Sequence, residues 1–450
     1  MKSFTKILVV VLTLSLLLGA CAPASAPVEE APVEEEVVEE AVVEEAVVEE
    51  EPAVSDMCMG AKAGDTLTVM SQWSGAEEEK LNAIFKPLVD ECGIEIVAES
   101  TRDNAVLDAR VKSTPPDILF WPDALPLNLY LDQLVPLDTL GGVAENYDKS
   151  WINKGSEVYD QWVTVDVKAD PKSLVWYSPA QFEIYGYSVP TSFAELDALV
   201  EQMVADGLVP WSMGMESEAA TGWTGSDYIQ DLVLTFEGPD YVNDLISGKV
   251  AYDDAGVVAA YEQWAKWASD PVYTVGGATG TVETGFLDAI YKVFQPEPEA
   301  MMVKQSGFAG GEVKTKYPDL EYGVDYDFFG FPGAKGLQGG SDSLYAFGTS
   351  AATKAMVTYL TTQAGADAWA AAGFDISPNK LSAGKYADVS LSKKSDMILS
   401  ATGFTPDMGD AIGAPFNTSE WAALIEVVQG GDVATALAKA AAAQAEALAD

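Results

Sequence analysis

The sequence contains no histidine, and this absence removes several kinds of enzyme from consideration. Ser-His-Asp and Cys-His catalysis, HExxH zinc sites and imidazole general bases all need an imidazole ring. An enzyme of this composition would have to use carboxylates, lysine or tyrosine. A glycosidase stays open, because its chemistry needs only two carboxyl groups at a set separation. We predict no metal site and no cofactor.

Basic residues are also scarce: 25 Lys and Arg stand against 70 Asp and Glu. Nucleic-acid binding is disfavoured, because neutralising phosphates requires clustered Lys and Arg. Attachment to anionic lipid through a basic patch is disfavoured for the same reason. The high negative charge is a statement about solubility and carries no information on the fold.

Only one long apolar run is present, and it lies at the N-terminus. Lys2 and Lys6 precede an apolar run from Ile7 to Leu18, a pattern typical of a secretory signal. Twelve helical residues rise only about 18 Å, short of the roughly 30 Å hydrocarbon core of a bilayer. We therefore predict that residues 1–20 are a cleaved signal peptide.

The signal ends in Leu18-Gly19-Ala20-Cys21, which resembles a bacterial lipobox. In such a sequence the cysteine thiol receives a diacylglycerol, and several acyl chains give durable anchoring at about 0.8 kcal/mol per buried methylene. This pattern predicts a mature protein that begins at Cys21 and is held by lipid on the extracytoplasmic face of a membrane.

Residues 21–55 predict an acidic tether. The stretch from 22 to 54 repeats PVEE and VVEE, with twelve Glu and no basic or aromatic residue. Such a composition cannot bury enough apolar surface to offset the entropy of ordering, and its like charges favour extension. A glutamate-rich helix is the alternative, but like charges at i, i+4 spacing disfavour it.

Cysteine is nearly absent from the remaining chain. With Cys21 assigned to lipid, Cys58 and Cys92 form an even pair in an oxidising compartment, where a disulfide between them would contribute about 3–4 kcal/mol. Two buried, reduced thiols are the alternative.

From Gly64 onward about 385 residues remain, which is too many for a single core and natural for two lobes. Strands are predicted at 66–70, 94–98 and 117–121, with helices at 76–90 and 106–112 between them. This β-α-β-α-β order predicts a parallel sheet covered by helices, with ligands beyond the carboxyl ends of the strands. Those ends are Ser71 to Glu77, Thr101 to Asp103 and Trp121 to Asp123.

The rest of the chain alternates helix and strand patterns. Strands are predicted at 174–177, 300–303 and 327–331. Helices are predicted at 192–206, 226–236, 257–269, 284–291, 351–364, 366–372 and 433–449.

Several stretches, taken together and in order, resemble the extracellular solute-binding proteins of carbohydrate ABC transporters, in particular the α-glucoside branch. They are GDTLTVMSQWSGAEEEKLNAIF (64–85), TRDNA (101–105), PPDILFWP (115–122), LVWYSPAQFEIYGYSVPTSFAELDALV (174–200), ATGWTGSDYIQDLVL (220–234), AMMVKQSGFA (300–309), GGSDSLYAF (339–347) and DISPNK (375–380). The segment FTPDMGDAIGAPF (404–416) departs from the family pattern. The resemblance covers nearly the whole folded part.

The resemblance implies an α/β fold of the type II periplasmic-binding-protein kind. Two lobes, each a mostly parallel sheet flanked by helices, would close over the ligand. It implies that lobe 1 comprises 56–170 and 296–372 and that lobe 2 comprises 171–295 and 373–450. The chain would cross between them near 165–173, 294–299 and 370–376. It further implies a monomer that captures a small carbohydrate, a disaccharide or short oligosaccharide, and delivers it to ABC permease subunits.

A sugar offers flat C–H faces and a rim of hydroxyls, so its receptor needs aromatic rings and planar polar groups in a dry site. The candidates at the loop positions named above, and at those the resemblance implies, are Trp73, Glu77, Arg102, Asp103, Trp121, Asp123, Tyr177, Trp223, Asp227, Phe308 and Asp342. For each there is a structural alternative: a Trp can pack in the core, Arg102 and Asp103 can form a surface ion pair, and Asp227 can be a charge at a helix N-terminus.

Two other functions stay open at this point. One is an anchored carboxylate-dependent glycoside hydrolase, although no acid/base pair is evident. The other is a receptor of the same fold for a polyol or a peptide.

Overall fold

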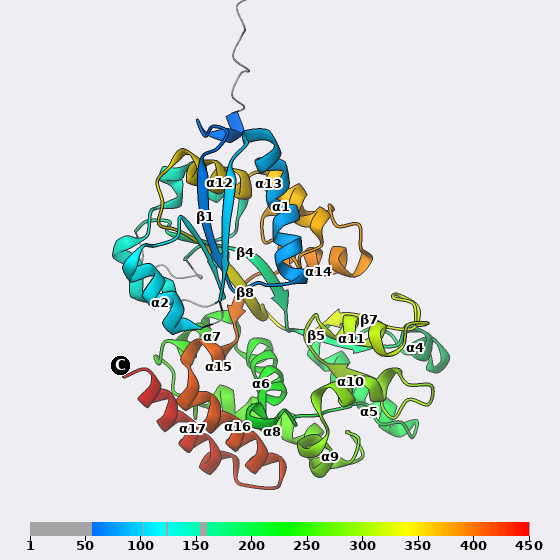
Figure 1. Ribbon diagram of the computed structural model, residues 1–450. Helices are drawn as coiled ribbons and strands as arrows, with labels where there is room; N and C mark the ends of the chain where they lie inside the picture. The colour runs from blue at the N-terminus through cyan, green and yellow to red at the C-terminus, as the bar shows by residue number, and fades with distance from the viewer. Residues whose placement is uncertain (1–55, 102, 123–124, 154–159, 450) are drawn as a thin grey trace, which may run out of the picture. The chain divides into compact units, whose positions relative to one another are not determined.

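The computed structural model describes residues 56–101, 103–122, 125–153 and 160–449. A six-stranded sheet organises the first group of elements, which we call lobe 1 (Figure 1). Its strands run in the order β2-β1-β3-β8-β4, and β9 pairs with β8. Their bounds are β1 Thr66–Ser71, β2 Glu95–Ser100, β3 Ile118–Trp121, β4 Thr164–Pro171, β8 Leu337–Ala346 and β9 Phe404–Pro406.

The predicted β-α-β-α-β unit is confirmed, because β1 pairs in parallel with both β2 and β3. Alternate residues of these strands point to opposite faces. Val69 and Phe120 face one core with helix α1, whereas Met70 and Leu119 face another with helix α2. The helices of lobe 1 are α1 Ala76–Cys92, α2 Asn104–Ser113, α3 Leu125–Tyr130, α12 Ala351–Thr361, α13 Gln363–Ala372 and α14 Val389–Ser400.

Lobe 2 surrounds a three-stranded sheet of order β6-β5-β7. Its strands are β5 Leu174–Tyr177, β6 Met302–Lys304 and β7 Asp327–Gly330. Its helices are α4 Pro179–Tyr185, α5 Phe193–Ala205, α6 Trp223–Phe236, α7 Pro239–Ile246, α8 Ala255–Ser269, α9 Gly277–Glu283, α10 Phe286–Phe294, α11 Ala309–Lys316, α15 Met408–Ile412, α16 Ala414–Val428 and α17 Val433–Ala447. Both strand pairs are antiparallel, which corrects the expectation of a mostly parallel sheet in each lobe.

Three connections join the lobes. The first is the turn after β4, at 172–173; the second runs from β7 to β8, at 331–336; the third leads from β9 into α15, at 406–407. The predicted lobe boundaries at 296 and 372 differ from this division. Residues 302–330 belong to lobe 2 because β6 and β7 pair with β5, and Phe374, Ile376 and Ile398 pack in the core of lobe 1.

The predicted disulfide is confirmed: Cys58 and Cys92 are bonded. It joins a short 3-10 helix, Asp56–Cys58, to the last residue of α1. The loop it closes spans 34 residues.

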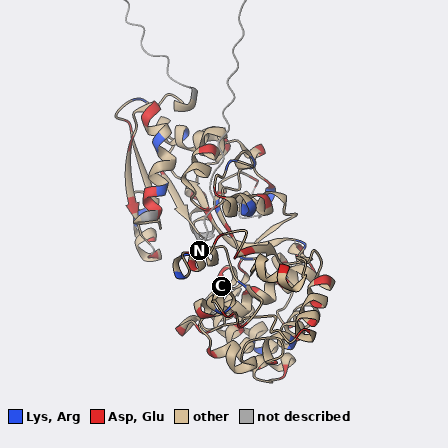
Figure 2. Cartoon of the chain, turned by 90° about the vertical axis from the view of Figure 1, so that its right-hand side faces the viewer, with Lys and Arg blue, Asp and Glu red and all other residues tan. Residues whose placement is uncertain are grey.

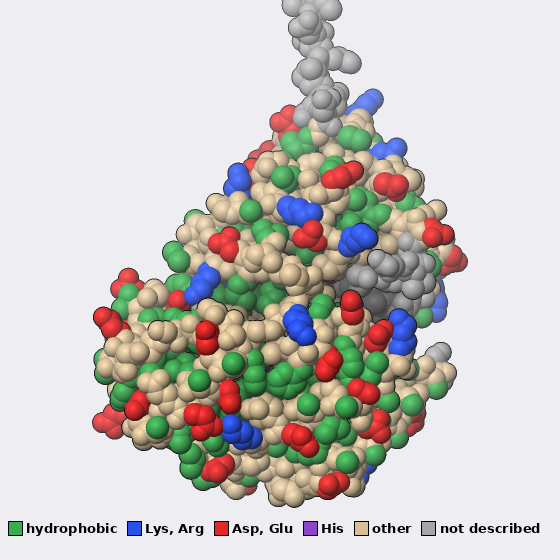
Figure 3. Space-filling model, turned by 180° about the vertical axis from the view of Figure 1, so that it is seen from behind, with side chains coloured by type: hydrophobic (Ala, Val, Ile, Leu, Met, Phe, Trp, Pro, Cys, Tyr) green, Lys and Arg blue, Asp and Glu red, His purple; other side chains and the backbone are tan. Residues whose placement is uncertain are grey.

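Acidic residues are distributed along the elements of both lobes (Figure 2). On the face shown in Figure 3, the Lys and Arg side chains of the described residues stand mostly apart from one another and do not form a patch. Within the described part of the chain, no helix combines the length and the apolar character needed to cross a bilayer.

Candidate ligand-binding site

Three aromatic side chains of lobe 2 form a row, which we call the aromatic row: Trp223, Phe286 and Phe308. Trp223 and Phe286 are the first residues of α6 and α10, and Phe308 immediately precedes α11. Ring centroids lie 5.4 Å apart for Trp223 and Phe286 and 6.2 Å apart for Phe286 and Phe308, both edge to face. Phe308 is 37% exposed and the other two are partly buried. The row therefore keeps aromatic surface available beside three helix N-termini.

A row of charged residues lies along the last part of β4 and extends one residue beyond it. Lys168, Asp170 and Lys172 alternate along the chain, so they share one face of an extended strand, and we call them the β4 charge row. Burial opposes the charged form of Lys168, but the carboxylates of Asp342 and Asp375 outweigh it and raise its pKa above the ordinary value. Its Nζ lies 3.1 Å from Asp342 and 3.0 Å from Asp375.

The lobe 1 end of this row contains two further polar groups. Gln72, directly after β1, donates from Nε2 to Asp342 at 2.7 Å. Asp375 has a φ of 47°, in the left-handed region that non-glycine residues seldom adopt, and its side chain is 39% exposed. Strain of this kind gathers at functional sites, where surrounding contacts hold it in place.

Asp170, in the middle of the charge row, meets lobe 2 at Gly307. A Cβ at position 307 would lie 2.0 Å from Asp170 Oδ1 and 2.8 Å from Lys394 Nζ, so only glycine fits. Lys394, on α14, donates to the Gly307 carbonyl at 2.9 Å. Burial raises the pKa of Asp170 to about 6, although the nearby Lys394 works in the other direction. This contact fixes the backbone that carries Phe308.

Lys172 joins the charge row to the aromatic row. Its Nζ lies 2.6 Å from Asp407 and 3.4 Å from Asp227, and 5.7 Å from the centre of the Trp223 ring. Burial opposes the charged form of Lys172, but Asp227 and Asp407 more than compensate and raise its pKa. Burial also raises the pKa of Asp227 to about 6, while Lys172 acts to lower it.

A second buried carboxyl lies behind this cluster. Glu420, on α16, accepts hydrogen bonds from Ser226 Oγ at 2.8 Å and from the Tyr252 hydroxyl. Burial raises the pKa of Glu420 to about 7 against the effect of both hydrogen bonds, and Asp407 and Asp227 raise it further. This carboxyl therefore carries a proton over much of the acidic range.

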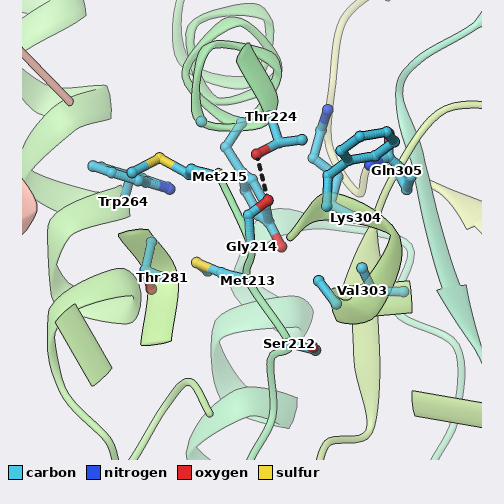
Figure 4. A pocket seen from close by; sticks show the side chains of 14 residues that line it. Ser212, Met213, Gly214, Met215, Thr224, Trp264, Thr281, Val303, Lys304 and Gln305 are labelled. Carbon is cyan, nitrogen blue, oxygen red and sulfur yellow. Dashed lines mark hydrogen bonds between the residues drawn. The ribbon is translucent and has the colours of Figure 1, made fainter. Parts of the chain in front are cut away.

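A small cavity (Figure 4) is lined by Phe286 of the aromatic row and by Thr224, the residue after Trp223. Thr224 donates to the Gly214 carbonyl at 2.9 Å. The free volume of the cavity, about 10 Å³, is near the least that one water molecule needs. Among the described residues, the Ser212 hydroxyl and the Trp264 indole N–H in its wall have no hydrogen-bond partner, so a single buried water suits the cavity and a sugar does not.

A larger groove of about 310 Å³ follows the second connection. None of its lining side chains is charged; they are Pro190, Thr191, Gly330, Phe331, Pro332, Gly333, Ala334, Gly336, Leu337, Met397, Ser400, Ala401 and Thr402. It lacks the paired planar polar groups that hydroxyl recognition requires. The aromatic row with the β4 charge row is the better candidate on chemical grounds, because it combines ring faces with ordered carboxylates and ammonium groups.

Four of the predicted site residues are brought to these two rows: Trp223, Asp227, Phe308 and Asp342. Three predicted aromatic residues lie elsewhere, in hydrophobic cores. Trp73 packs against Phe374, Trp121 is 2% exposed, and Tyr177 packs against Phe182. Their rings have almost no exposed surface, because the buried strands that precede or contain them place these side chains in the hydrophobic core.

The remaining predicted residues are polar. Asp103 caps helix α2 by accepting from the Ala105 backbone N–H at 2.8 Å, and Glu77 is partly buried in the first turn of α1. Arg102 and Asp123 lie outside the described residues. The roles of all four in ligand binding stay predictions.

Sequence reasoning missed several residues of the candidate site. They are Gln72, Lys168, Asp170, Lys172, Phe286, Asp375 and Asp407. The alternation of Lys168, Asp170 and Lys172 was a usable signal, because charged residues at every second position of a strand share a face. Asp407 belongs to the segment 404–416, which departs from the family pattern.

Comparison with known proteins identifies relatives of this chain. No protein-family model matches the chain. The α-glucosides-binding periplasmic protein AglE of Rhizobium meliloti is 28% identical over 403 residues, which cover 84% of this chain and 87% of AglE. The chain is a relative of periplasmic ABC-transporter binding proteins. A second relative, the osmoprotective compounds-binding protein GgtB of Synechocystis, is 26% identical over 81% of this chain and 89% of its own length.

Solved structures show that the chain has the fold of type II periplasmic solute-binding proteins. The solute receptor AcbH superposes with a TM-score of 0.72 at 21% identity, covering 86% of this chain and 98% of AcbH. The apo form of RafE from Streptococcus pneumoniae gives a TM-score of 0.68 at 16% identity, covering 86% of this chain and 99% of RafE. At these identities the likeness shows the fold alone, and it confirms the predicted fold class.

Proposed function

We propose that this protein captures a small carbohydrate between its lobes and delivers it to the permease of an ABC importer. The observation that carries the proposal is the aromatic row beside the paired charges of Lys168 and Lys172. Ring faces stack on sugar C–H groups, and carboxylates and ammonium groups that are already held in place bind hydroxyls with little loss of entropy. The relative named for α-glucosides supports an α-glucoside-like disaccharide as the ligand.

A thermal-shift screen tests the proposal. The purified protein is heated with maltose, trehalose, sucrose and raffinose, with polyols including glycerol, and with short peptides. A ligand present at a hundred times its Kd adds about 2.7 kcal/mol of stability, which is a clear upward shift. We expect a shift with at least one sugar. The relative that binds osmoprotective compounds supports including polyols, and a shift with polyols alone would replace the sugar in the proposal.

Two substitutions locate the ligand. Trp223→Ala and Asp123→Ala should each weaken binding of the sugar at least tenfold while the fold is kept. Tyr185→Ala is the matched control, because Tyr185 is also an aromatic residue of lobe 2 but is 42% exposed on α4. Unchanged affinity in both variants, measured by calorimetric titration, would remove the site assignment.

The protein binds its ligand without altering it in this proposal. The relatives are named as binding proteins, which supports this view over the anchored glycoside hydrolase. Incubation of the purified protein with the sugars of the screen should release no reducing sugar beyond the buffer control. Sustained, protein-dependent release would favour the hydrolase.

We further propose that lipid on Cys21 and the tether of residues 21–55 hold the protein on the extracytoplasmic face of a membrane as a monomer. The lipobox and the acidic repeat support this. Tethering raises the local concentration of the receptor at the permease. Cys21→Ser should move the protein from the membrane fraction to the soluble extracytoplasmic fraction, and retention in the membrane would contradict the anchor.

A further inference from the structure

Helix α6 carries a buried polar face next to the lobe connections. Asp227, Gln230 and Asp231 stand at i, i+3 and i+4, so they lie on the same side of the helix. Their exposures are 2%, 2% and 0%. Buried polar side chains are costly unless they are paired, so the partners of these three groups are informative.

The first and second connections are both held by this face. Ser173 Oγ, in the first connection, donates to Asp231 Oδ1 at 2.5 Å. Gln338, where the second connection enters β8, donates from Nε2 to the backbone carbonyl of Asp227 at 2.5 Å. The Gln338 backbone N–H in turn donates to Ser173 Oγ at 2.9 Å, which ties the two connections to each other.

The third connection is held mainly by Gln230, and the side chain of Asp227 also bonds Asp407 there. Its Nε2 donates to Thr405 Oγ1 at 3.1 Å and to the Pro406 carbonyl at 2.7 Å. Its Oε1 accepts from the Met408 backbone N–H at 2.8 Å. One side chain therefore makes three hydrogen bonds across the end of β9 and the start of α15.

The same helix begins with Trp223, whose ring centre lies 5.7 Å from Lys172 Nζ. A helix is stiff over the two turns that separate position 223 from position 230, so a displacement of its first turn reaches the polar face. Among the described helices, α6 is the one whose hydrogen bonds, as given above, reach all three lobe connections.

We propose that α6 couples ligand contact at Trp223 to lobe closure, with Gln230 and Asp231 as positioning residues for the three connections. The inference rests on the proposed function. A ligand shifts a conformational equilibrium only by its differential affinity for the two states, and a rigid element shared by the binding surface and the connections supplies that difference.

The test separates closure from binding. Exposed Lys112 of lobe 1 and Lys249 of lobe 2 are replaced by cysteine in a Cys21→Ser chain, and fluorescent labels on them report the distance between the lobes. Gln230→Met keeps the volume of the side chain and removes its three hydrogen bonds. At saturating sugar we expect the ligand-induced distance change to fall to half of the wild-type value or less, with at least tenfold weaker affinity, equal to about 1.4 kcal/mol.

Ser226→Ala is the matched control. Ser226 is buried on the same helix, but its hydroxyl donates to Glu420 within lobe 2 and touches no connection. Because its lost hydrogen bond lies outside the connections, this variant should keep the distance change. Its affinity should stay within about twofold of wild type, which is well under the 1.4 kcal/mol of a tenfold change. A merely structural role for Gln230 would lower the urea midpoint and leave the distance change of the folded protein intact, which would overturn the inference.

Two further results make the test decisive. If Gln230→Met does not fold, Ser173→Ala removes the contact to Asp231 with the loss of one hydroxyl, and its distance change must also be reduced. If wild type responds to none of the sugars of the screen, the proposed function fails. If wild type closes on the sugar and Gln230→Met and Ser173→Ala close equally well, the proposed function stands and only the coupling role of α6 fails.

Discussion

The buried carboxyl of Glu420 makes a prediction about pH that can be worked through from its surroundings. Burial raises its pKa from an ordinary 4.5 to about 7 in the folded protein. A raised pKa means that the folded state binds the proton more tightly than the unfolded chain does. Glu420 therefore contributes stability that is fully present below about pH 4.5 and is lost as the pH rises through 7.

The size of this effect follows from the shift. One pKa unit corresponds to 1.36 kcal/mol, so the contribution of Glu420 to the free energy of unfolding falls by about 2–3 kcal/mol between pH 5 and pH 8. Other buried carboxyls, such as Asp170 and Asp227, titrate in the same range. The contribution of Asp170 is common to two proteins that differ only at position 420, whereas Asp227 interacts with Glu420 and is part of the measured difference.

Urea unfolding of wild type and Glu420→Gln at several pH values between 5 and 8 measures the difference. Glutamine cannot ionise, so the stability of the variant relative to wild type should rise by about 2–3 kcal/mol across this range. Glu426→Gln, a change at a more exposed position of α16 that pairs with Lys439, should show no such trend. Parallel stability curves for wild type and Glu420→Gln would refute the reasoning, because they would mean that Glu420 titrates normally in the fold.

Two other substitutions test the fold around the site. Gly307→Ala should lower the free energy of unfolding by about 1–3 kcal/mol and weaken sugar binding, because the new methyl group displaces Asp170 and Lys394. Gly311→Ala is the control, because the space around its Cβ is open. Equal urea midpoints for the two variants would contradict the close approach at Gly307. Replacing Cys58 and Cys92 with serine should lower the free energy of unfolding by about 3–4 kcal/mol, and a loss below about 1 kcal/mol would show that the 34-residue loop is restrained by other contacts.

Local patterns in the sequence were enough to place part of the fold. The strand-helix alternation after Gly64 led to the correct parallel order of β2, β1 and β3, since such connections are short and of fixed hand. The two cysteines that remained after Cys21 were correctly paired. A glycine beside an aromatic residue suggested a turn at both Trp73 and Trp223; Trp223 lies in the aromatic row, whereas Trp73 packs in a core. Phe308 came from the family resemblance.

What the sequence did not reveal depends on contacts between distant segments. Lys172 and Asp407 are 235 residues apart, and Lys168 and Asp342 are 174 residues apart. Each of these charged side chains is, by residue type, typical of solvent-exposed positions. It can be buried here because its oppositely charged partner offsets the free energy lost when the charge leaves water. The antiparallel sheet of lobe 2 was missed for a similar reason, because β5 pairs with two strands that follow it by more than 120 residues.

If the proposed lipid anchor holds the protein on a membrane, the disulfide decides how a mechanical pull from that anchor enters the folded part. Any force along the chain before Asp56 meets Cys58 two residues later, and there it passes through a covalent bond to the end of α1. The load is then shared by a 17-residue helix and the strands beneath it, so the first segment does not peel away. Lobe 2 stays outside this load path, and tension on the tether would leave its rotation about the three connections unhindered.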